Sequence, residues 1–377
     1  MWKLGFDAKR AYQNYSGLGN YSRYVLSAMI NMYPENAYYL YTPRVKIHFL
    51  DHLVEHKKNV TLVDVTSLPK VLHPLWRNIY IPFDLKRKGI QLYHGLSNEL
   101  PVGISAKIPK VVTIHDLIFM RFPQWYNATD RKIYYHKSLY ACRKADRIIA
   151  MSEFTKQDIV TYLGISPDKI EVIYQDCDTR FHKIVSDSDK QKVLQKYGLQ
   201  SPYMLSVGTI EKRKNQLAIV KAFHRLNNKD VQLVLVGRST SYMNEIQKYI
   251  QKHGLGDHVR ILNDVTSDDL PALYGEALFS VYISTIEGFG IPILESMYTE
   301  CPVITTRYSS MQEIAADAAL YITQDNVEEL TSQMGMMLSQ PALRETLIEK
   351  SKNRLPLFES KQSIIKMTDI YRTLIEG

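Results

Sequence analysis

The stretch LFSVYISTIEGFGIPILES, residues 278–296, combines a short apolar run, a glycine loop and the beginning of a helical pattern. Its β-branched and aromatic residues are typical of a buried strand. Pro292, directly after the loop, is favoured in the first turn of a helix. Two acids, Glu287 and Glu295, flank the glycines. The stretch therefore predicts a strand–loop–helix unit with a polar site at its turn.

The same alternation of strand-like runs and helical patterns extends through the chain. Because strands that alternate with helices form parallel sheets covered on both faces, the pattern predicts an α/β protein. The alternation restarts near residue 200 after a polar interval, and 377 residues suggest two domains at roughly 100–200 residues per domain. We predict two Rossmann-like domains, residues 1–180 and 181–357, followed by a helical segment at 358–377. The strand-like runs are residues 3–8, 38–42, 60–65, 91–95, 110–116, 147–152, 170–174, 203–208, 232–237, 259–264, 278–284, 302–306 and 318–323.

The composition is that of a globular protein, with 45% hydrophobic and 23% charged residues. The three cysteines, Cys142, Cys177 and Cys301, form no CxxC pair, so neither a zinc site nor a disulfide framework is predicted. Charged residues within the first ten positions do not fit the apolar core of a signal peptide, and no run of 18 apolar residues follows. We expect a cytoplasmic protein and leave open its attachment to the inner face of the membrane.

The net charge of +8 is unevenly distributed. Residues 1–185 carry 26 Lys and Arg against 16 Asp and Glu, whereas the remaining residues carry a small acidic excess. A basic half suggests an anionic partner such as a membrane surface, a nucleic acid or a phosphorylated substrate, or it is an ordinary solvated surface. No groove-reading or base-stacking motif is visible, so no nucleic-acid partner is expected.

Three glycine loops resemble nucleotide fingerprints at first sight. GLGNYS (17–22) has Ser22 where a dinucleotide loop needs Gly or Ala, and it lacks a clear acid about 20 residues later. GLGDHV (254–259) is interpreted as a plain helix-to-strand loop, and no GxxxxGK[ST] loop exists. GFG (288–290) begins a helix, where free N–H groups suit phosphate or sugar oxygens, although a turn could need the glycines for its backbone alone.

The acids beside GFG favour a ligand site over a plain turn. Glu287 and Glu295 would both lie near the carboxyl edge of the sheet, where ligands of open α/β domains bind. Carboxylates accept hydrogen bonds from the vicinal hydroxyls of ribose and hexose. Two acids with N–H groups between them suit a ligand with a sugar at each end and phosphates between, which is a nucleotide sugar.

A second motif, VGTIEKRKNQ at 207–216, follows the first strand of the second domain. Its Arg213 and Lys214 stand at a probable helix start, where they would neutralise a diphosphate leaving group without a metal. A solvated basic turn is the alternative. The tripeptide DCD (176–178) matches the D-x-D of metal-dependent transferases, but it follows no nucleotide-site strand, so no metal and no cofactor are predicted.

With these motifs, the sequence resembles glycosyltransferase family 4 over nearly its whole length. The motifs that carry the resemblance are Glu287 to Glu295 at the spacing E-x7-E, SGLGNYSRY (16–24), VTIHD (112–116), ADRIIAMSEFTKQDI (145–159) and VGTIEKRKN. The resemblance implies the GT-B architecture of two Rossmann-like domains facing a cleft, with the last helix crossing back to the first domain. It also implies retaining, metal-independent transfer from a nucleotide-sugar donor.

The resemblance also assigns roles to individual residues. Glu295 would bind the ribose, Glu287 the transferred sugar, and Arg213 and Lys214 the diphosphate, while His115 would lie beside the reacting carbon. The remaining donor-binding positions implied by the family are Gly17, Gly19, Gly208, Thr209, Asp264, Val265, Gly288, Phe289, Gly290 and Ile291. At position 209 many members carry Arg, whereas this chain has Thr. One phosphate contact of the family is therefore not expected here, and phosphate binding would depend more on Arg213 and Lys214.

The form of the VGT motif resembles the bacterial mannosyltransferase branch. We therefore expect transfer of mannose from GDP-mannose to a saccharide or lipid-linked saccharide in surface polysaccharide synthesis, with a UDP-sugar as the alternative donor. An epimerase, phosphorylase or dinucleotide oxidoreductase on a similar scaffold fits less well, as does a basic nucleic-acid- or membrane-binding protein without transferase activity. The basic and aromatic stretches around Lys86–Lys88 and Tyr134–Lys137 suggest contact with an anionic membrane surface.

Overall fold

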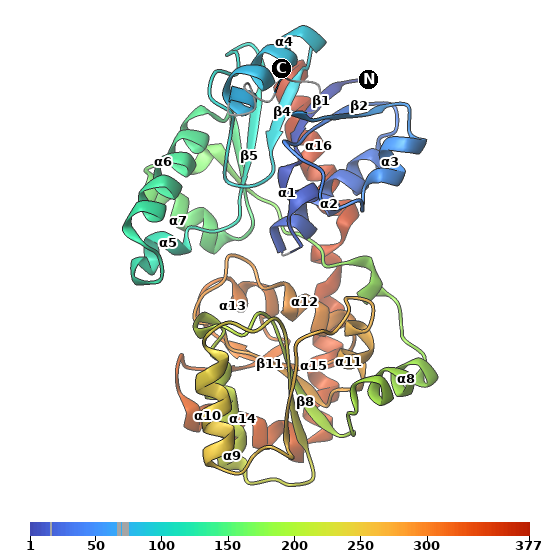
Figure 1. Cartoon of the computed structure of the whole chain (residues 1–377), viewed down its shortest axis with the longest axis vertical. Coiled ribbons are helices and arrows are strands. Elements are labelled where there is room, and N and C mark those ends of the chain that lie inside the picture. The colour runs from blue at the N-terminus through green and yellow to red at the C-terminus, as the bar shows by residue number, and fades with distance from the viewer. Residues whose placement is uncertain (16, 66–68, 70–74) are drawn as a thin grey trace. The chain divides into compact units, whose positions relative to one another are not determined.

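The computed structural model of the chain describes residues 1–15, 17–65, 69 and 75–377. The chain divides into unit 1 (Met1–Gln175 with Phe358–Gly377) and unit 2 (Asp176–Leu357), each built on its own parallel sheet (Figure 1). The first boundary between the two units thus lies between residues 175 and 176, whereas the sequence predicts a domain boundary after residue 180. Ser16, the first residue of the motif SGLGNYSRY, lies outside the described residues.

Unit 1 contains a seven-stranded sheet in the order β3-β2-β1-β4-β5-β6-β7, and all its strand pairs are parallel. Each strand coincides with one of the first seven runs expected from the sequence, and only β2 begins outside its run, by one residue. Apolar runs such as KVVTI are buried along their whole length because helices cover both faces. The strands are β1 (Lys3–Asp7), β2 (Ala37–Tyr41), β3 (Val60–Val63), β4 (Leu92–Gly95), β5 (Lys110–Ile114), β6 (Arg147–Ala150) and β7 (Ile170–Val172).

The last helix of the chain, α16 (Ser360–Glu376), belongs to unit 1, where it packs against α2 and β4 (Figure 1). Its buried residues recur at helical spacing. The hydroxyl oxygen of one of them, Tyr371, lies 2.5 Å from Nδ1 of His94. The α-helices of the N-terminal part are α1 (Lys9–Gln13), α2 (Gly17–Met32), α3 (Asp51–His56), α4 (Ile81–Lys88), α5 (Ile118–Arg121), α6 (Ala128–Lys144) and α7 (Glu153–Leu163), with a π-helix η3 (Trp76–Tyr80) before α4.

Unit 2 contains a six-stranded parallel sheet in the order β10-β9-β8-β11-β12-β13. Its strands are β8 (Tyr203–Val207), β9 (Gln232–Val236), β10 (Val259–Leu262), β11 (Phe279–Tyr282), β12 (Val303–Thr306) and β13 (Ala319–Ile322). Its α-helices are α8 (Asp187–Tyr197), α9 (Gln216–Leu226), α10 (Met243–Lys252), α11 (Leu270–Glu276), α12 (Ile291–Tyr298), α13 (Ser310–Ala315), α14 (Val327–Ser339) and α15 (Pro341–Arg354).

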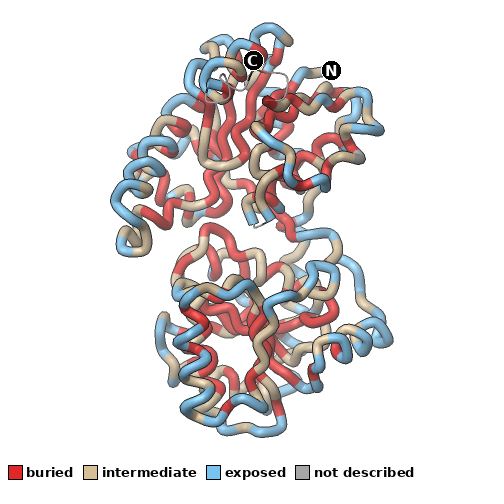
Figure 2. The backbone as a smooth tube through the Cα atoms, in the orientation of Figure 1, coloured by how far each residue is buried: buried red, intermediate tan, exposed pale blue. Residues whose placement is uncertain are grey.

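Each sheet forms the core of its own unit, with buried strands and exposed outer helix faces (Figure 2). Phe223, Phe279 and Met334 belong to the core cluster of unit 2, and Leu85 and Tyr93 to that of unit 1. In both sheets the strand order reverses next to the first strand, between β1 and β4 and between β8 and β11. Ligands of open parallel sheets bind at the carboxyl ends of strands at such a switch point. The loops after β8 and β11 are therefore the first place to look for a site.

Candidate functional site

The loops after β8 and β11 bring the two predicted motifs of unit 2 together. The main-chain N–H of Thr285 donates to the carbonyl of Arg213 at 2.8 Å, and Arg213 Nη1 donates to the carbonyl of Ile286 at 2.9 Å. Gly208 carries a φ of 146°, and a Cβ on Gly237 would lie 1.9 Å from the Gly208 carbonyl oxygen. Glycine is required at 237 because the main chains after β8 and β9 touch there.

The side chain of Glu287 holds both predicted cations. Its Oε1 lies 2.6 Å from Lys214 Nζ and 2.6 Å from Arg213 Nη1. Lys214 also donates to the hydroxyl of Tyr282 at 2.7 Å, and Arg213 pairs with Glu211 at 2.7 Å. The side chains of Glu287 and Lys214 are each only 12% exposed, so water screens this group of charges weakly.

The electrostatics of this group keep Glu287 ionised. Burial alone would raise the pKa of Glu287, but Lys214 and Arg213 lower it to about 2. Burial lowers the pKa of Lys214, while Glu287 opposes that shift. The pKa of Arg213 lies above its usual value because the attraction of Glu287 and Glu211 exceeds the opposing effect of burial. The side chains of Arg213 and Lys214 therefore lie at the switch point as charged groups, and both pair with the carboxylate of Glu287.

Glu295, eight residues further on, has the opposite environment. It lies in α12, partly buried, and accepts a hydrogen bond from the hydroxyl of Tyr274 at 3.1 Å. Burial raises the pKa of Glu295 to about 7; the hydrogen bond from Tyr274 opposes that rise, and the nearby charge of Asp178 adds a smaller upward shift. Glu295 therefore changes its charge close to neutral pH, whereas Glu287 does not.

The glycine loop between the acids turns the chain from strand to helix. Gly290 adopts a φ of 118° directly before α12, a left-handed conformation that glycine tolerates best. Gly288, Phe289 and Gly290 are buried, and Ile291 is partly exposed. Among the other expected donor positions, Thr209 accepts a hydrogen bond on its carbonyl from Gln216 at 3.0 Å. Asp264 is exposed and Val265 partly exposed, after β10, which is two strands away from β8.

Unit 1 holds the remaining expected residues at the carboxyl ends of β1 and β5. A Cβ on Gly19, in the first turn of α2, would lie 1.8 Å from the carbonyl oxygen of Asn14, so this close approach requires glycine, whereas Gly17 has open space around it. His115 Nε2 donates to the carbonyl of Leu96 at 2.9 Å, and its ring meets Tyr21 edge-on. Burial lowers the pKa of His115 to about 4, so the ring is neutral at pH 7.

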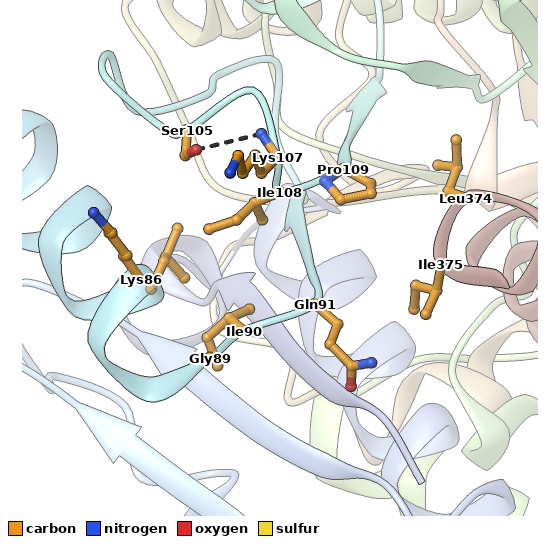
Figure 3. A pocket seen from close by; sticks show the side chains of 11 residues that line it. Lys86, Gly89, Ile90, Gln91, Ser105, Lys107, Ile108, Pro109, Leu374 and Ile375 are labelled. Atoms are coloured by element: carbon orange, nitrogen blue, oxygen red, sulfur yellow. Dashed lines mark hydrogen bonds between the residues drawn. The ribbon is translucent and has the colours of Figure 1, made fainter. Parts of the chain in front are cut away.

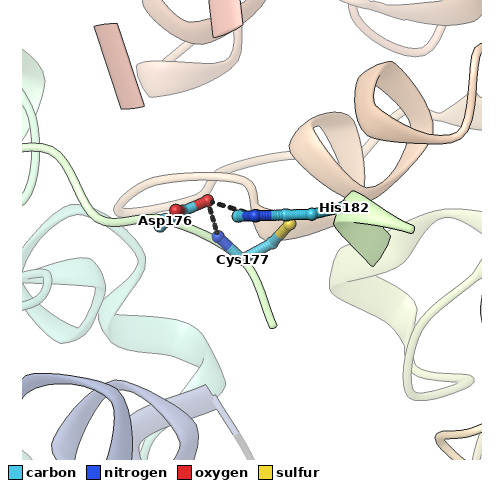
Figure 4. A group of neighbouring side chains, drawn as sticks. All are labelled: Asp176, Cys177 and His182. Carbon is cyan, nitrogen blue, oxygen red and sulfur yellow. Dashed lines mark hydrogen bonds and ion pairs between the residues drawn. The ribbon is translucent and has the colours of Figure 1, made fainter. Parts of the chain in front are cut away.

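The DCD tripeptide lies at the beginning of unit 2, where Asp176 and Cys177 lie beside His182 (Figure 4). Its two aspartates have different partners. Asp176 Oδ1 lies 3.0 Å from His182 Nε2 and accepts the N–H of Cys177 at 2.8 Å. Asp178 instead accepts from the main chain and side chain of Arg180. Within the described residues, ligand atoms of Asp176, Cys177 and His182 lie within 4.8 Å of one another. The Asp–His pair already accounts for this geometry, and the absence of a resident metal stays a prediction.

The structure adds residues that sequence spacing could not reveal. Tyr274 contacts Glu295 from α11, and Tyr282 contacts Lys214 from β11. Ser309 and Ser310, after β12, bond to the main chain of the glycine loop. These residues come from other turns of the fold, and ordinary Ser and Tyr side chains carry no motif signal. Glu211, inside the motif VGTIEKRKN, could have been noticed as a partner for Arg213.

The chain is similar to known proteins over most of its length. Residues 187–354 match the family model described as Glycosyl transferases group 1, and residues 16–181 match Glycosyltransferase Family 4. The O-antigen chain mannosyltransferase B of Escherichia coli is 28% identical over 75% of this chain and 74% of its own length. A Campylobacter jejuni enzyme, N-acetylgalactosamine-N,N'-diacetylbacillosaminyl-diphospho-undecaprenol 4-alpha-N-acetylgalactosaminyltransferase, is 29% identical over 57% of each chain.

The fold is also that of solved glycosyltransferase structures. The Anabaena protein HepE in complex with UDP-glucose has a TM-score of 0.78 to this chain at 18% identity, covering 99% of this chain and 100% of its own. The two parallel-sheet units thus form the GT-B fold predicted from the sequence. Among the described residues, no helix is long and apolar enough to cross a membrane.

The buried charge group generates a prediction about stability. Glu287→Gln should leave two cations poorly compensated and lower the free energy of unfolding by about 3 kcal/mol. Adding Lys214→Met should recover at least about 1 kcal/mol, because the uncompensated charge is then removed. Chemical denaturation of the single and double variants measures the coupling. The exposed pair Lys192–Asp189 (Lys192→Met, Asp189→Asn) is the control and should couple by less than about 0.5 kcal/mol; equal coupling in the two pairs would contradict the prediction.

Proposed function

Because the chain belongs to glycosyltransferase family 4, we propose that it transfers a hexose from a nucleotide-sugar donor with retention of configuration and without a metal cofactor. The observation that carries the proposal is the position of Glu287, Arg213 and Lys214 at the switch point of unit 2. Two cations on the loop after β8 suit a diphosphate, and the carboxylate of Glu287 beside them, on the loop after β11, suits the hydroxyls of the attached sugar.

Donor binding in this proposal is an exchange of partners. The diphosphate takes the positions that Glu287 Oε1 occupies on Arg213 and Lys214, and Glu287 turns its acceptors to the sugar hydroxyls. Glu295 accepts hydrogen bonds from the ribose at the other end of the same loop. The N–H groups at the beginning of α12 add their partial positive charge to this site.

The chemical step follows from where charge develops. The bond between the anomeric carbon and the diphosphate oxygen loosens first, which leaves an oxocarbenium-like sugar and a more negative diphosphate. Arg213 and Lys214 stabilise that negative charge at fixed positions. The acceptor hydroxyl attacks the anomeric carbon from the face that the diphosphate leaves, and its proton passes to a diphosphate oxygen, so configuration is retained. His115, neutral at pH 7, serves as a hydrogen-bonding group beside the sugar and not as a charged acid.

Mannose from GDP-mannose is the donor that we propose. The support is the VGT form of the phosphate motif and the name of the Escherichia coli relative, O-antigen chain mannosyltransferase B. A UDP-sugar is the second candidate, because HepE carries UDP-glucose on the same fold and the Campylobacter relative is named for a different sugar.

Calorimetry tests the donor class. We expect GDP to bind at least tenfold more tightly than UDP, ADP or NAD, and transfer from GDP-mannose to survive EDTA because the two cations screen the diphosphate. A clear UDP preference would overturn the donor but leave the reaction class intact. NAD binding without any nucleoside diphosphate binding would overturn the glycosyltransferase proposal as a whole.

The raised pKa of Glu295 predicts pH-dependent nucleotide binding. Below pH 7 the carboxyl is increasingly protonated and loses acceptors for the ribose hydroxyls, so binding should weaken as pH falls. We expect the Kd for the preferred nucleoside diphosphate to rise about fivefold or more from pH 8 to pH 6. Glu295→Gln should bind more weakly at pH 8 and show a flatter profile. The matched variant Glu287→Gln should keep the wild-type slope, and an unchanged slope in Glu295→Gln would contradict the assignment.

We propose that the acceptor is a lipid-linked saccharide at the cytoplasmic face of a membrane, as the name of the Campylobacter relative suggests for that protein. Support comes from η3 and α4, where Ile79 is 58% and Phe83 62% exposed. Lys86 and Lys107 line a cavity of about 410 Å³ beside this helix, at the amino ends of β4 and β5 (Figure 3). Exposed apolar side chains next to lysines suit an anionic lipid surface.

The structure changes which basic residues this surface can use. Arg87 and Lys88 pair with the buried carboxylate of Asp84 at 2.6 and 2.9 Å, so they neutralise a charge inside unit 1. Lys137 pairs with Glu99, while its neighbour Tyr134 is 42% exposed. Lys86 and Lys107 are therefore better candidates for contact with lipid than the whole cluster that the sequence indicated.

Vesicle co-sedimentation tests this membrane surface. We expect the protein to bind anionic vesicles at low salt, to be released by high salt, and to bind neutral vesicles poorly, since each basic residue near an anionic surface contributes about 1 kcal/mol. Lys86→Glu/Lys107→Glu and Phe83→Ser should each reduce binding at least fivefold. Lys248→Glu, an exposed lysine in α10 of unit 2, is the charge control. Equal recovery on both vesicle types, or none on either, would indicate a soluble acceptor.

A further inference from the structure

The loop after β12 contains two serines that contact the main chain of the glycine loop from outside it. The N–H of Glu287 donates to Ser309 Oγ at 3.1 Å. The hydroxyl of Ser310 lies 2.9 Å from the carbonyl oxygen of Glu287 and 2.6 Å from that of Phe289, so its single proton is shared between two acceptors. Both main-chain polar groups of Glu287 are thus held by adjacent serines.

Ser309 accepts the hydrogen bond from Glu287 while its own backbone is in a strained conformation. Its φ is 60° and its ψ is −151°, a combination that is nearly confined to glycine. Glycine would relieve the strain at this position, but glycine has no hydroxyl to accept the N–H of Glu287. Ser309 is strained although glycine could take its place without strain, and its hydroxyl binds the main chain of Glu287, the proposed sugar-binding acid. This combination points to a functional constraint on Ser309.

Ser310 is fully buried and begins α13, so its position is fixed by the helix and by the packing of unit 2. The glycine loop that it contacts has Gly288 and Gly290 on either side of Phe289, and glycine main chain is the most freely rotating in proteins. The serine contacts therefore restrain a segment whose own sequence would leave its backbone loose. When Arg213 and Lys214 turn to a diphosphate, the side chain of Glu287 loses its ion pairs, and the serines remain to fix its main chain.

We propose that Ser309 and Ser310 are positioning residues for transfer: they hold the main chain of Glu287 and Phe289 so that the Glu287 carboxylate and the N–H groups at the beginning of α12 face the donor sugar. This inference rests on the proposed function. Neither serine needs to touch the donor. Their action is on the orientation of the loop that does, so they should affect turnover more than the binding of a free nucleotide.

The decisive variants are Ser309→Gly and Ser310→Ala. Ser309→Gly removes the hydroxyl and the strain together, so its melting temperature should equal or exceed that of the wild type while kcat for transfer falls at least tenfold. Ser310→Ala should also lower kcat at least tenfold. In both variants the Kd for the preferred nucleoside diphosphate should stay within about twofold, because Glu295, Arg213 and Lys214 are unchanged. Ser351→Ala, which removes a buried hydroxyl bond in α15 of the same unit, should leave kcat and Kd as in the wild type.

Hydrogen exchange of the purified protein gives a second measurement that does not depend on the reaction. The amide of Glu287 should exchange at least tenfold faster in Ser309→Gly than in the wild type, whereas amides of β11 should keep their protection. Wild-type kcat in both variants, or unchanged exchange at Glu287 in Ser309→Gly, would overturn the positioning role. If the wild-type protein binds no nucleoside diphosphate and transfers no sugar, the proposed function fails, and the exchange measurement still decides whether the serines hold the loop.

Discussion

The ion pairs from Arg213 and Lys214 to one oxygen of Glu287 are the interaction on which the candidate site depends. Lys214 and Glu287 are 73 residues apart in the chain, and they meet because β8 and β11 are neighbours where the strand order reverses. Removing like-charged cations from water is costly unless a carboxylate compensates them. Glu287 supplies that compensation in the absence of a ligand, and the proposed diphosphate supplies it when the donor is bound.

Two acids on either side of one glycine loop illustrate how surroundings set the charge of a carboxyl group. Glu287 and Glu295 flank the same three residues GFG, yet Glu287 has a pKa of about 2 and Glu295 of about 7. Both are taken out of water by the surrounding residues, so burial pushes both pKa values upward. The difference comes from their partners: two cations face Glu287, whereas a tyrosine hydroxyl and the charge of Asp178 face Glu295. A permanently charged acid and a titrating acid thus stand at the two ends of one proposed donor site.

Unit 1 contributes a histidine and a surface that need different explanations. His115 is held by Leu96 and Tyr21 and carries no charge at neutral pH, so any catalytic role is that of a polar neutral group. Of the three adjacent basic residues in α4, two are used to neutralise the buried Asp84. The excess charge of the first 185 residues is therefore partly an internal structural feature and only partly available to an anionic partner.

The sequence by itself determined the α/β class, the strands of the two sheets, the helical last segment and the two motifs at 208–214 and 287–295 that make up the candidate site, because alternating apolar patterns and glycine loops are local features. The family resemblance also predicted that the last helix crosses back to the first domain, as α16 does. The sequence did not determine that Arg87 and Lys88 pair with Asp84, or that Ser309 and Ser310 hold the glycine loop. It assigned Glu287 and Glu295 to different parts of the donor but did not reveal their different pKa values. Those facts depend on which strands lie side by side and on how far each side chain is removed from water, and residues distant in the chain decide both.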